Sequence, residues 1–262
     1  MVSDYLNQIR SIEELDKIIE HDREVAAKIA KTVFKREVNS AITNISEIIQ
    51  IANARILADS QVASAKMMSD AEVMSTLILS KAELAALEVQ QQLITEPDDF
   101  TSMHEKIVEI GRNTGTLISK TTSQSVEAIH REAKAAIDQL QENAAKAIEE
   151  IHSLADEVAA KVEENAQIAT DVLRKQKAHD RTLEDVIQNA ETQAQMILDD
   201  AARSSAELHK AKDKAIADLK LFVDKATLEI QGAEKASERR ILAARDQALA
   251  HIKEVIARHT LE

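Results

Sequence analysis

Four residues of this chain have the types and the spacing of a metal site. Glu127 and His130 form a Glu-x-x-His pair, and Glu149 and His152 repeat it twenty-two residues later. In di-iron bundles, this spacing places a carboxylate and an imidazole on one helix face. On a single helix the two pairs would be about 33 Å apart and could not share a metal pair. We therefore expect all four residues to lie on solvated flanks, and we predict no metal and no cofactor.

Other catalytic arrangements are also missing from the sequence. The chain has no cysteine, which excludes a thiolate nucleophile, a disulfide and a cysteine-ligated metal. Gly111 and Gly115 are not part of a G-x-x-x-x-G-K motif, so they do not predict a phosphate-binding loop. No set of serine, histidine and aspartate can be placed together in a pocket. We therefore predict that the protein is not an enzyme.

The composition predicts an all-α protein. Gly 3 and Pro 1 in 262 residues are too few for the turns of a many-stranded sheet. Aromatic residues make up 2%, which is little bulk for a globular core, yet 44% of the residues are hydrophobic and 30% are charged. This profile is typical of long helices and coiled coils.

Large apolar residues recur every eleven residues in three blocks. A seven-residue series from Phe34 fails, because it reaches Arg55 and Ser69. Eleven residues complete about three helical turns, so such a row runs almost parallel to the helix axis and favours straight or slightly right-handed packing. We call these rows the stripe and predict that they carry packing and interaction: Phe34, Ile45, Ile56, Met67, Ile78, Val89, Ile118, Ile129, Leu140, Ile151, Val162, Leu173, Val186, Ile197, Leu208, Leu219, Ile230, Ile241 and Ile252.

Small residues accompany each block of the stripe. They lie four residues before the first and third blocks and four residues after the second, and they allow helices to approach closely. The rows include Ala30, Ala41, Ala52, Ala63 and Ala85; Ala133, Ala144, Ala155 and Ala166; and Ser204, Ala215, Ala226, Ser237 and Ala248. The stripe is therefore expected to pack as an alanine-lined hendecad seam.

Helix boundaries are marked by capping signals and by the single proline. Ser11 and Glu14 have the spacing of a capping box, so a long helix is predicted to begin near Ile12, within a segment 1–95. Pro97 disfavours helical geometry and predicts a turn at 96–101. A second helix is predicted over 102–173.

Two weak points interrupt the pattern further along. Gly111 and Gly115 predict a kink or a short break, because each glycine costs a helix about 1 kcal/mol relative to alanine. The stripe then steps by thirteen residues from Leu173 to Val186, across the polar segment 174–182. Either the chain turns there, or one continuous helix changes the face that it buries.

These two interpretations predict different topologies. Thr182 and Asp185 could cap a new helix, which gives a three-helix coiled-coil rod with a third block at 183–260. The absence of glycine and proline from the segment slightly favours the continuous helix, which would give an elongated antiparallel hairpin with a projecting end.

The third block also resembles a known family. The run from Ala190 to Leu208, AETQAQMILDDAARSSAEL, resembles the peripheral-stalk subunits of rotary ATPases, such as subunit b or E. The resemblance covers residues 186–256. It implies a stalk-like mechanical role, although the sequence has no membrane anchor like that of subunit b.

Charge narrows the expected partners and location. The net charge of −13 argues against nucleic acid, since phosphate backbones repel an acidic chain. With no signal-peptide pattern and no spanning segment, we expect a cytoplasmic protein. The leading hypothesis is a structural scaffold that assembles with itself or with another helical protein through the stripe. The alternative is an amphipathic protein on a lipid or granule surface, which the acidic charge and scarce aromatics disfavour.

Overall fold

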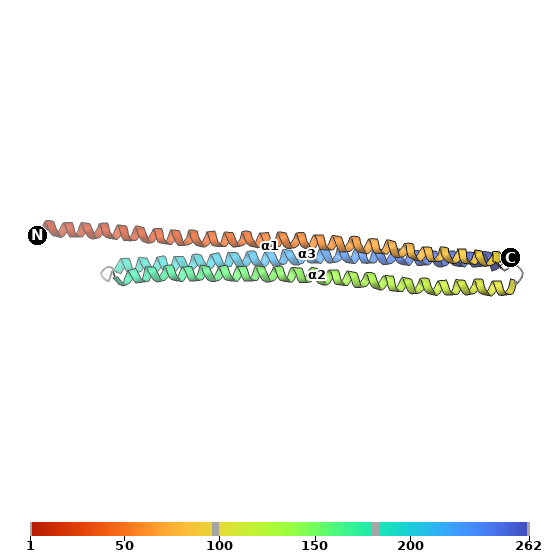
Figure 1. The fold of residues 1–262 in the computed structure, drawn as a ribbon. Helices are drawn as coiled ribbons and strands as arrows, with labels where there is room; N and C mark the ends of the chain where they lie inside the picture. Colours follow the sequence, from red (N-terminus) through yellow and green to blue (C-terminus); the bar gives the residue numbers. More distant parts are fainter. Residues whose placement is uncertain (1, 96–99, 180–183, 261–262) are drawn as a thin grey trace. The chain divides into compact units, whose positions relative to one another are not determined.

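The structure, a computed structural model, describes the backbone of residues 2–95, 100–179 and 184–260, and every one of these residues is helical. Helix α1 spans Val2–Thr95, α2 spans Phe100–His179 and α3 spans Glu184–Thr260. The protein is therefore all-α, as its composition predicts. Figure 1 shows the three helices and their order along the chain.

Contacts between helices divide the chain into two compact units. The first unit comprises Met1–Ala52 and Ala145–Lys220, and the second comprises Asn53–Ala144 and Leu221–Glu262. Each unit contains a segment of all three helices, packed side by side. The core of each unit is thus built from residues that are far apart in the sequence.

Polar contacts in the second unit establish the helix directions. Lys66 Nζ lies 2.5 Å from Glu132 Oε1, and Lys81 Nζ lies 3.1 Å from Thr121 Oγ1. Residue numbers rise along α1 as they fall along α2, so these helices are antiparallel. A third contact joins α1 to α3, where Ser60 Oγ donates to Glu229 Oε2 at 3.0 Å.

Helices α1 and α3 run parallel with a constant offset of 169 residues. In the second unit this offset joins Ser60 to Glu229 and Met68 to Ser237. In the first unit it joins Lys31 to Asp200, where Lys31 Nζ lies 3.2 Å from Asp200 Oδ2. Each unit is therefore a three-helix bundle in which α2 runs against both neighbours.

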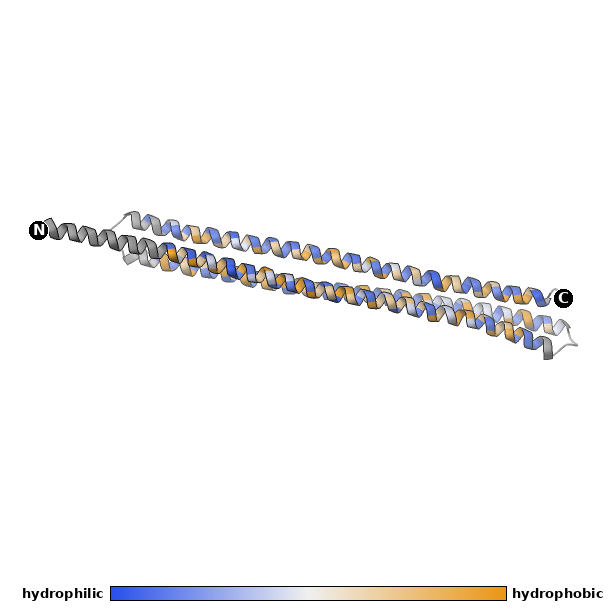
Figure 2. Ribbon diagram, turned by 90° about the horizontal axis from the view of Figure 1, so that it is seen from above, coloured by the Kyte–Doolittle hydropathy of each residue, from blue (hydrophilic) through white to orange (hydrophobic). Residues whose placement is uncertain are grey.

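The core of each unit consists of the large apolar residues of all three helices. In the first unit Phe34, Ile151 and Leu208 belong to one buried cluster, with small residues such as Ala155 between them. In the second unit Ile78 and its counterparts on α2 and α3 are equally buried. Figure 2 shows hydrophobic and hydrophilic residues intermixed along each helix, because one face meets neighbouring helices and another meets solvent.

Of the two interpretations that the sequence leaves open for residues 174–182, the three-helix one is confirmed, and the slightly favoured continuous helix is wrong. Helix α2 ends at His179, a separate helix begins at Glu184, and α3 packs alongside α1 and α2. Apolar contacts along α3 outweigh the local helix propensity that favoured continuation. Residues 180–183 and 96–99 lie outside the described part of the chain.

Other helix boundaries differ more modestly from expectation. Helix α1 begins at Val2 rather than near Ile12, so the Ser11 capping signal lies within a helix. Helix α1 ends at Thr95 as predicted, but α2 begins at Phe100, two residues early. A capping pattern can occur at more than one position in a sequence. Residues of high helix propensity that precede it can therefore extend the helix beyond the predicted start.

Of the kink or short break predicted at Gly111 and Gly115, the break is absent, because α2 is continuous there. A β-carbon built on Gly111 would lie 2.0 Å from Ile256 Cδ1 and 3.2 Å from its Cγ1. Gly111 therefore serves the close approach of α3 to α2. At Gly115 the nearest atom, from Leu249, would lie at an ordinary 3.8 Å.

A glycine comparison tests this explanation. We expect Gly232→Ala to stabilise the protein by about 1 kcal/mol, since Gly232 is inside α3 with no atom within 4 Å of the added carbon. Gly111→Ala should give a smaller gain or a loss, because Ile256 must move. Urea denaturation of both variants measures the difference. Equal gains at the two sites would contradict a packing role for Gly111.

Candidate functional site

The stripe lies inside the bundle of each unit. Every stripe side chain that the structure describes is buried, and the most exposed, Ile252, is only 6% accessible. The side chain of Val186 lies outside the described residues. The rows on α1, α2 and α3 therefore join the chain's own helices, and any partner must approach through the outer faces.

The small rows are packed beside the stripe. Ala155 and Ala248 are fully buried, and Ser237 is the most buried serine of the third row. Ala30 and Ala63 are only partly buried. Small side chains at these positions let the helices approach without leaving voids.

The two Glu-x-x-His pairs do not form a common site. Glu127, Glu149 and His152 are exposed. The Nδ1 atom of His130 instead lies 2.5 Å from Glu234 Oε1 on α3. Among the described residues, no group of three or more histidine and carboxylate side chains could hold a metal ion. Sequence reasoning missed the contact of His130 with Glu234, since it joins residues 104 positions apart.

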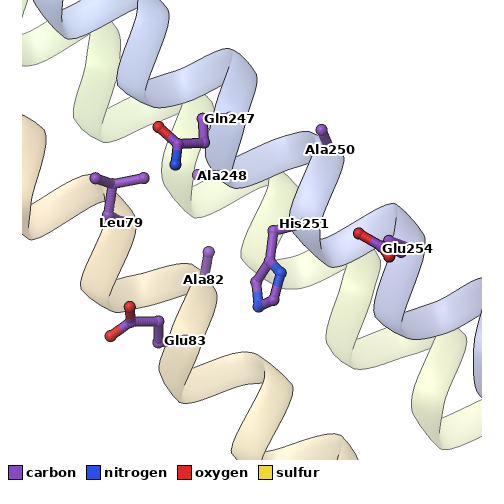
Figure 3. Close-up of a pocket in the computed structure, with 8 residues that line it drawn as sticks. All are labelled: Leu79, Ala82, Glu83, Gln247, Ala248, Ala250, His251 and Glu254. Atoms are coloured by element: carbon purple, nitrogen blue, oxygen red, sulfur yellow. The ribbon is translucent and has the colours of Figure 1, made fainter.

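A shallow hollow lies between α1 and α3 in the second unit. Its volume is about 400 Å³, and Figure 3 shows the His251 side chain on the side of α3 that faces α1. Its lining consists of Leu79, Ala82, Glu83, Gln247, Ala248, Ala250, His251 and Glu254. An imidazole and two carboxylates can exchange protons, but the lining supplies no hydroxyl, thiol or amine nucleophile. The hollow therefore does not define a reaction.

Buried hydroxyl groups on α2 differ in how they are satisfied. Thr122 Oγ1 donates to the carbonyl oxygen of Ile118 at 2.9 Å. Thr170 is 0% exposed, and its Oγ1 has no hydrogen-bond partner. A buried hydroxyl without a hydrogen-bond partner costs free energy, and the buried apolar residues Ala166 and Leu173 lie within about one turn of it on α2.

An exposed ion pair on α2 shifts two pKa values. Lys161 Nζ donates to Glu157 Oε1 at 2.5 Å, one helical turn away. This hydrogen bond, and after it the positive charge of Lys161, lower the pKa of Glu157. The same hydrogen bond, and after it the negative charge of Glu157, raise the pKa of Lys161. The pair is typical of a solvated helix flank.

The Glu157 shift predicts a pH dependence with a definite sign. Because the folded-state pKa lies below the unfolded value, the pair stabilises the protein above the unfolded pKa, and the effect disappears as the pH falls through the folded one. We expect a carbon-detected NMR titration to give Glu157 a midpoint below the usual glutamate range. In Lys161→Gln that midpoint should return to the usual range. An unchanged midpoint would show that the pair does not form in solution.

Exposed apolar side chains are concentrated on α1. Of the seventeen large apolar residues that are exposed in the described part of the chain, eleven lie on α1. In the second unit these include Val62, Val73 and Leu84, each more than 60% exposed. Over the described residues, helices α2 and α3 each carry three exposed large apolar residues. Helix α1 thus has an apolar surface on its outer side as well as in the core.

Comparison with known proteins supports the fold. No protein-family model matches the chain, and no curated protein matches its sequence. One solved structure similar to it is a "Computationally designed three helix bundle", with a TM-score of 0.68 and 12% sequence identity. The match covers 95% of this chain and 100% of the designed one. The fold class is therefore a three-helix bundle. Over the described residues, no stretch of helix combines the length and apolarity needed to cross a bilayer.

Proposed function

We propose that this protein is a non-enzymatic structural protein, a coiled-coil rod that spaces or scaffolds its partners. The observation that carries the proposal is the burial of the stripe on all three helices. A stripe residue such as Ile78, Leu140 or Ile230 is completely buried in its unit. Three helices whose side chains are closely packed against one another resist bending better than each helix would alone.

The parallel register supports the same role. Contacts between α1 and α3 keep an offset of 169 residues at Lys31, Ser60 and Met68. A constant register over several turns requires both helices to share one rise and one period, as hendecad repeats do. The likeness of residues 186–256 to rotary ATPase stalks suggests that the load is mechanical.

The surface chemistry supports a protein partner. At a net charge of −13, nucleic acid is a poor partner. We propose a second copy of this chain or another helical protein, in the cytoplasm. The hollow beside His251 lacks a nucleophile among its lining residues, which supports a role without catalysis.

Small-angle X-ray scattering tests the rod. Helices of 77 to 94 residues, laid straight, would give a radius of gyration of roughly 35–40 Å at 1.5 Å per residue. A globular protein of this length would give about 18 Å. Circular dichroism should report a largely helical chain. A radius near the globular value would refute the proposal.

The alternative role, on a lipid surface, requires a different arrangement of the apolar rows. Helices lying flat on lipid must expose their apolar rows, whereas here Ile56, Ile129 and Leu219 are buried against other helices. We expect the protein to remain at the bottom of a gradient when it is mixed with anionic or neutral vesicles. Flotation at physiological salt would favour the lipid-surface role instead.

A further inference from the structure

Helix α1 of the second unit carries a second apolar row on its outer side. Val62, Val73 and Leu84 are spaced by eleven residues and are 68%, 61% and 64% exposed. Their spacing equals that of the buried row, so the outer row also runs almost parallel to the helix axis. These three side chains are thus outside the buried core of the bundle.

A row of small residues lies beside this outer row. Ala58, Ser69 and Ser80 precede Val62, Val73 and Leu84 by four residues each. The buried row of the first block has the same arrangement, with Ala52 four residues before Ile56 and both side chains buried. We call Ala58, Val62, Ser69, Val73, Ser80 and Leu84 the outer face of α1. Its large and small rows are those of a helix-packing seam.

The outer face is complementary to itself when one copy is reversed. About a two-fold axis at the level of residue 71, Val73 of one copy meets Ser69 of the other. In the same register Val62 meets Ser80, and Leu84 meets Ala58. Each large side chain of the outer face is then opposite a small one, so the face is self-complementary, as an isologous dimer interface requires.

Charge at the edge of the outer face fits the same register. Arg55 lies near one end and Glu88 near the other, and the two-fold axis brings each beside the other's copy. Neither makes an ion pair with another described residue of its own chain. On the opposite edge Glu72 lies near the axis, where Arg240 Nη2 at 3.5 Å offsets its charge.

The area of the outer face is sufficient for a dimer. From Ala54 to Gln91 the face extends roughly 55 Å, and a helix contributes a strip about 10 Å wide. Two copies would thus bury on the order of 1,100 Å² in total, just above the area that specific interfaces need.

We propose that the outer face of α1 is an antiparallel homodimer interface. This proposal rests on the structural role proposed above and names the partner as a second copy of the chain. Packing of Val73 against Ser69 of the partner supplies the apolar centre, and the Arg55 and Glu88 pairs set the direction. The product is a six-helix assembly with two α1 helices at its centre.

Sedimentation velocity tests the interface by comparing the wild-type chain with a variant that carries a charge at the centre of the interface. We expect the wild-type chain to sediment as a dimer at micromolar concentrations. Val73→Lys should raise the dissociation constant at least a hundredfold, because two lysines then meet at the axis. Val73 is exposed in the single chain, so helicity and melting temperature of the monomer should not fall. Leu228→Lys, on an equally exposed α3 position, is the matched control and should remain dimeric.

A charge exchange tests the antiparallel direction. Arg55→Glu and Glu88→Arg should each weaken the dimer at least threefold, since like charges then face each other. The double variant restores opposite charges only in the antiparallel register and should recover wild-type affinity. The chain has no cysteine, so single spin labels are simple to place. Pairs of labels at Gln61 should lie about 30 Å apart and at Gln90 about 55 Å apart.

The possible outcomes separate this inference from the proposed function. A helical monomer at 100 μM with a large radius of gyration would overturn the dimer and leave the rod intact. A dimer that survives Val73→Lys would overturn the choice of face. A monomer that floats with vesicles would assign the face to lipid and also overturn the inference. A compact, weakly helical chain would refute the proposed function itself.

Discussion

Ile230→Ala should destabilise the protein by about 2–5 kcal/mol. Ile230 belongs to the stripe on α3 and is 0% exposed. Truncation removes buried aliphatic surface and leaves a cavity that a close-packed helical core fills only in part. Urea denaturation, followed by helical circular dichroism, measures the change in the free energy of unfolding.

Leu228 provides the matched control two residues away on the same helix. Its side chain is 67% exposed, so Leu228→Ala should change the free energy of unfolding by no more than about 0.5 kcal/mol. Leucine and isoleucine lose the same number of carbon atoms in these substitutions. Comparable losses at the two positions would mean that α3 does not present the stripe to the core.

Thr170→Val should stabilise the protein by roughly 1–3 kcal/mol, the cost of a buried hydroxyl that lacks a partner. Valine has nearly the shape of threonine, and Thr170 is completely buried with Oγ1 unpaired. The substitution therefore removes the desolvation cost without opening a cavity. Thermal and urea denaturation should both show the gain.

Thr122 is the control for this substitution, on the same helix and only 3% exposed. Because Thr122 Oγ1 donates to Ile118, Thr122→Val exchanges a satisfied hydroxyl for a methyl group. We expect no gain there, or a loss of about 1 kcal/mol. If both variants gained equally, the effect would come from hydrophobicity alone and not from the missing hydrogen bond.

The position of the stripe was largely predictable from the sequence. An eleven-residue period is a local property of helical geometry, so it identifies the residues of one face without any knowledge of the neighbours. Phe34, Ile118 and Ile241 were selected in this way, and all three are buried. The eleven-residue supercoil and the role of the stripe in assembly stay predictions.

The direction of the third helix was not predictable in the same way. The segment 174–182 contains neither glycine nor proline, so local preference allowed a continuous helix. Folding α3 back buries residues such as Leu208 and Leu219 against α1 and α2. That free energy depends on contacts between residues far apart in the sequence, 169 positions for Lys31 and Asp200 and 56 for Asp156 and Lys212, which no local pattern contains.

For the candidate site residues as well, the sequence predicted the local pattern but not the long-range contact. The spacing of Glu127 and His130 suggested a common face, but the partner of His130 is Glu234 on another helix. Gly111 suggested a kink or a short break, and what the structure shows there is a continuous helix with Ile256 of α3 packed against the glycine. In both cases the function of the residue depends on a side chain that arrives from a distant part of the chain.

The amino-acid pattern alone determined that the chain is helical and which residues form rows along each helix, because period and propensity act over a few turns. Tertiary structure decided that a second apolar row of α1 stays uncovered. Both the row through Ile56 and the row through Val62 are aliphatic with the same period, but α2 and α3 cover only the first. Two helices can cover only one side of a third, and the row left outside is the surface that we propose meets a second copy.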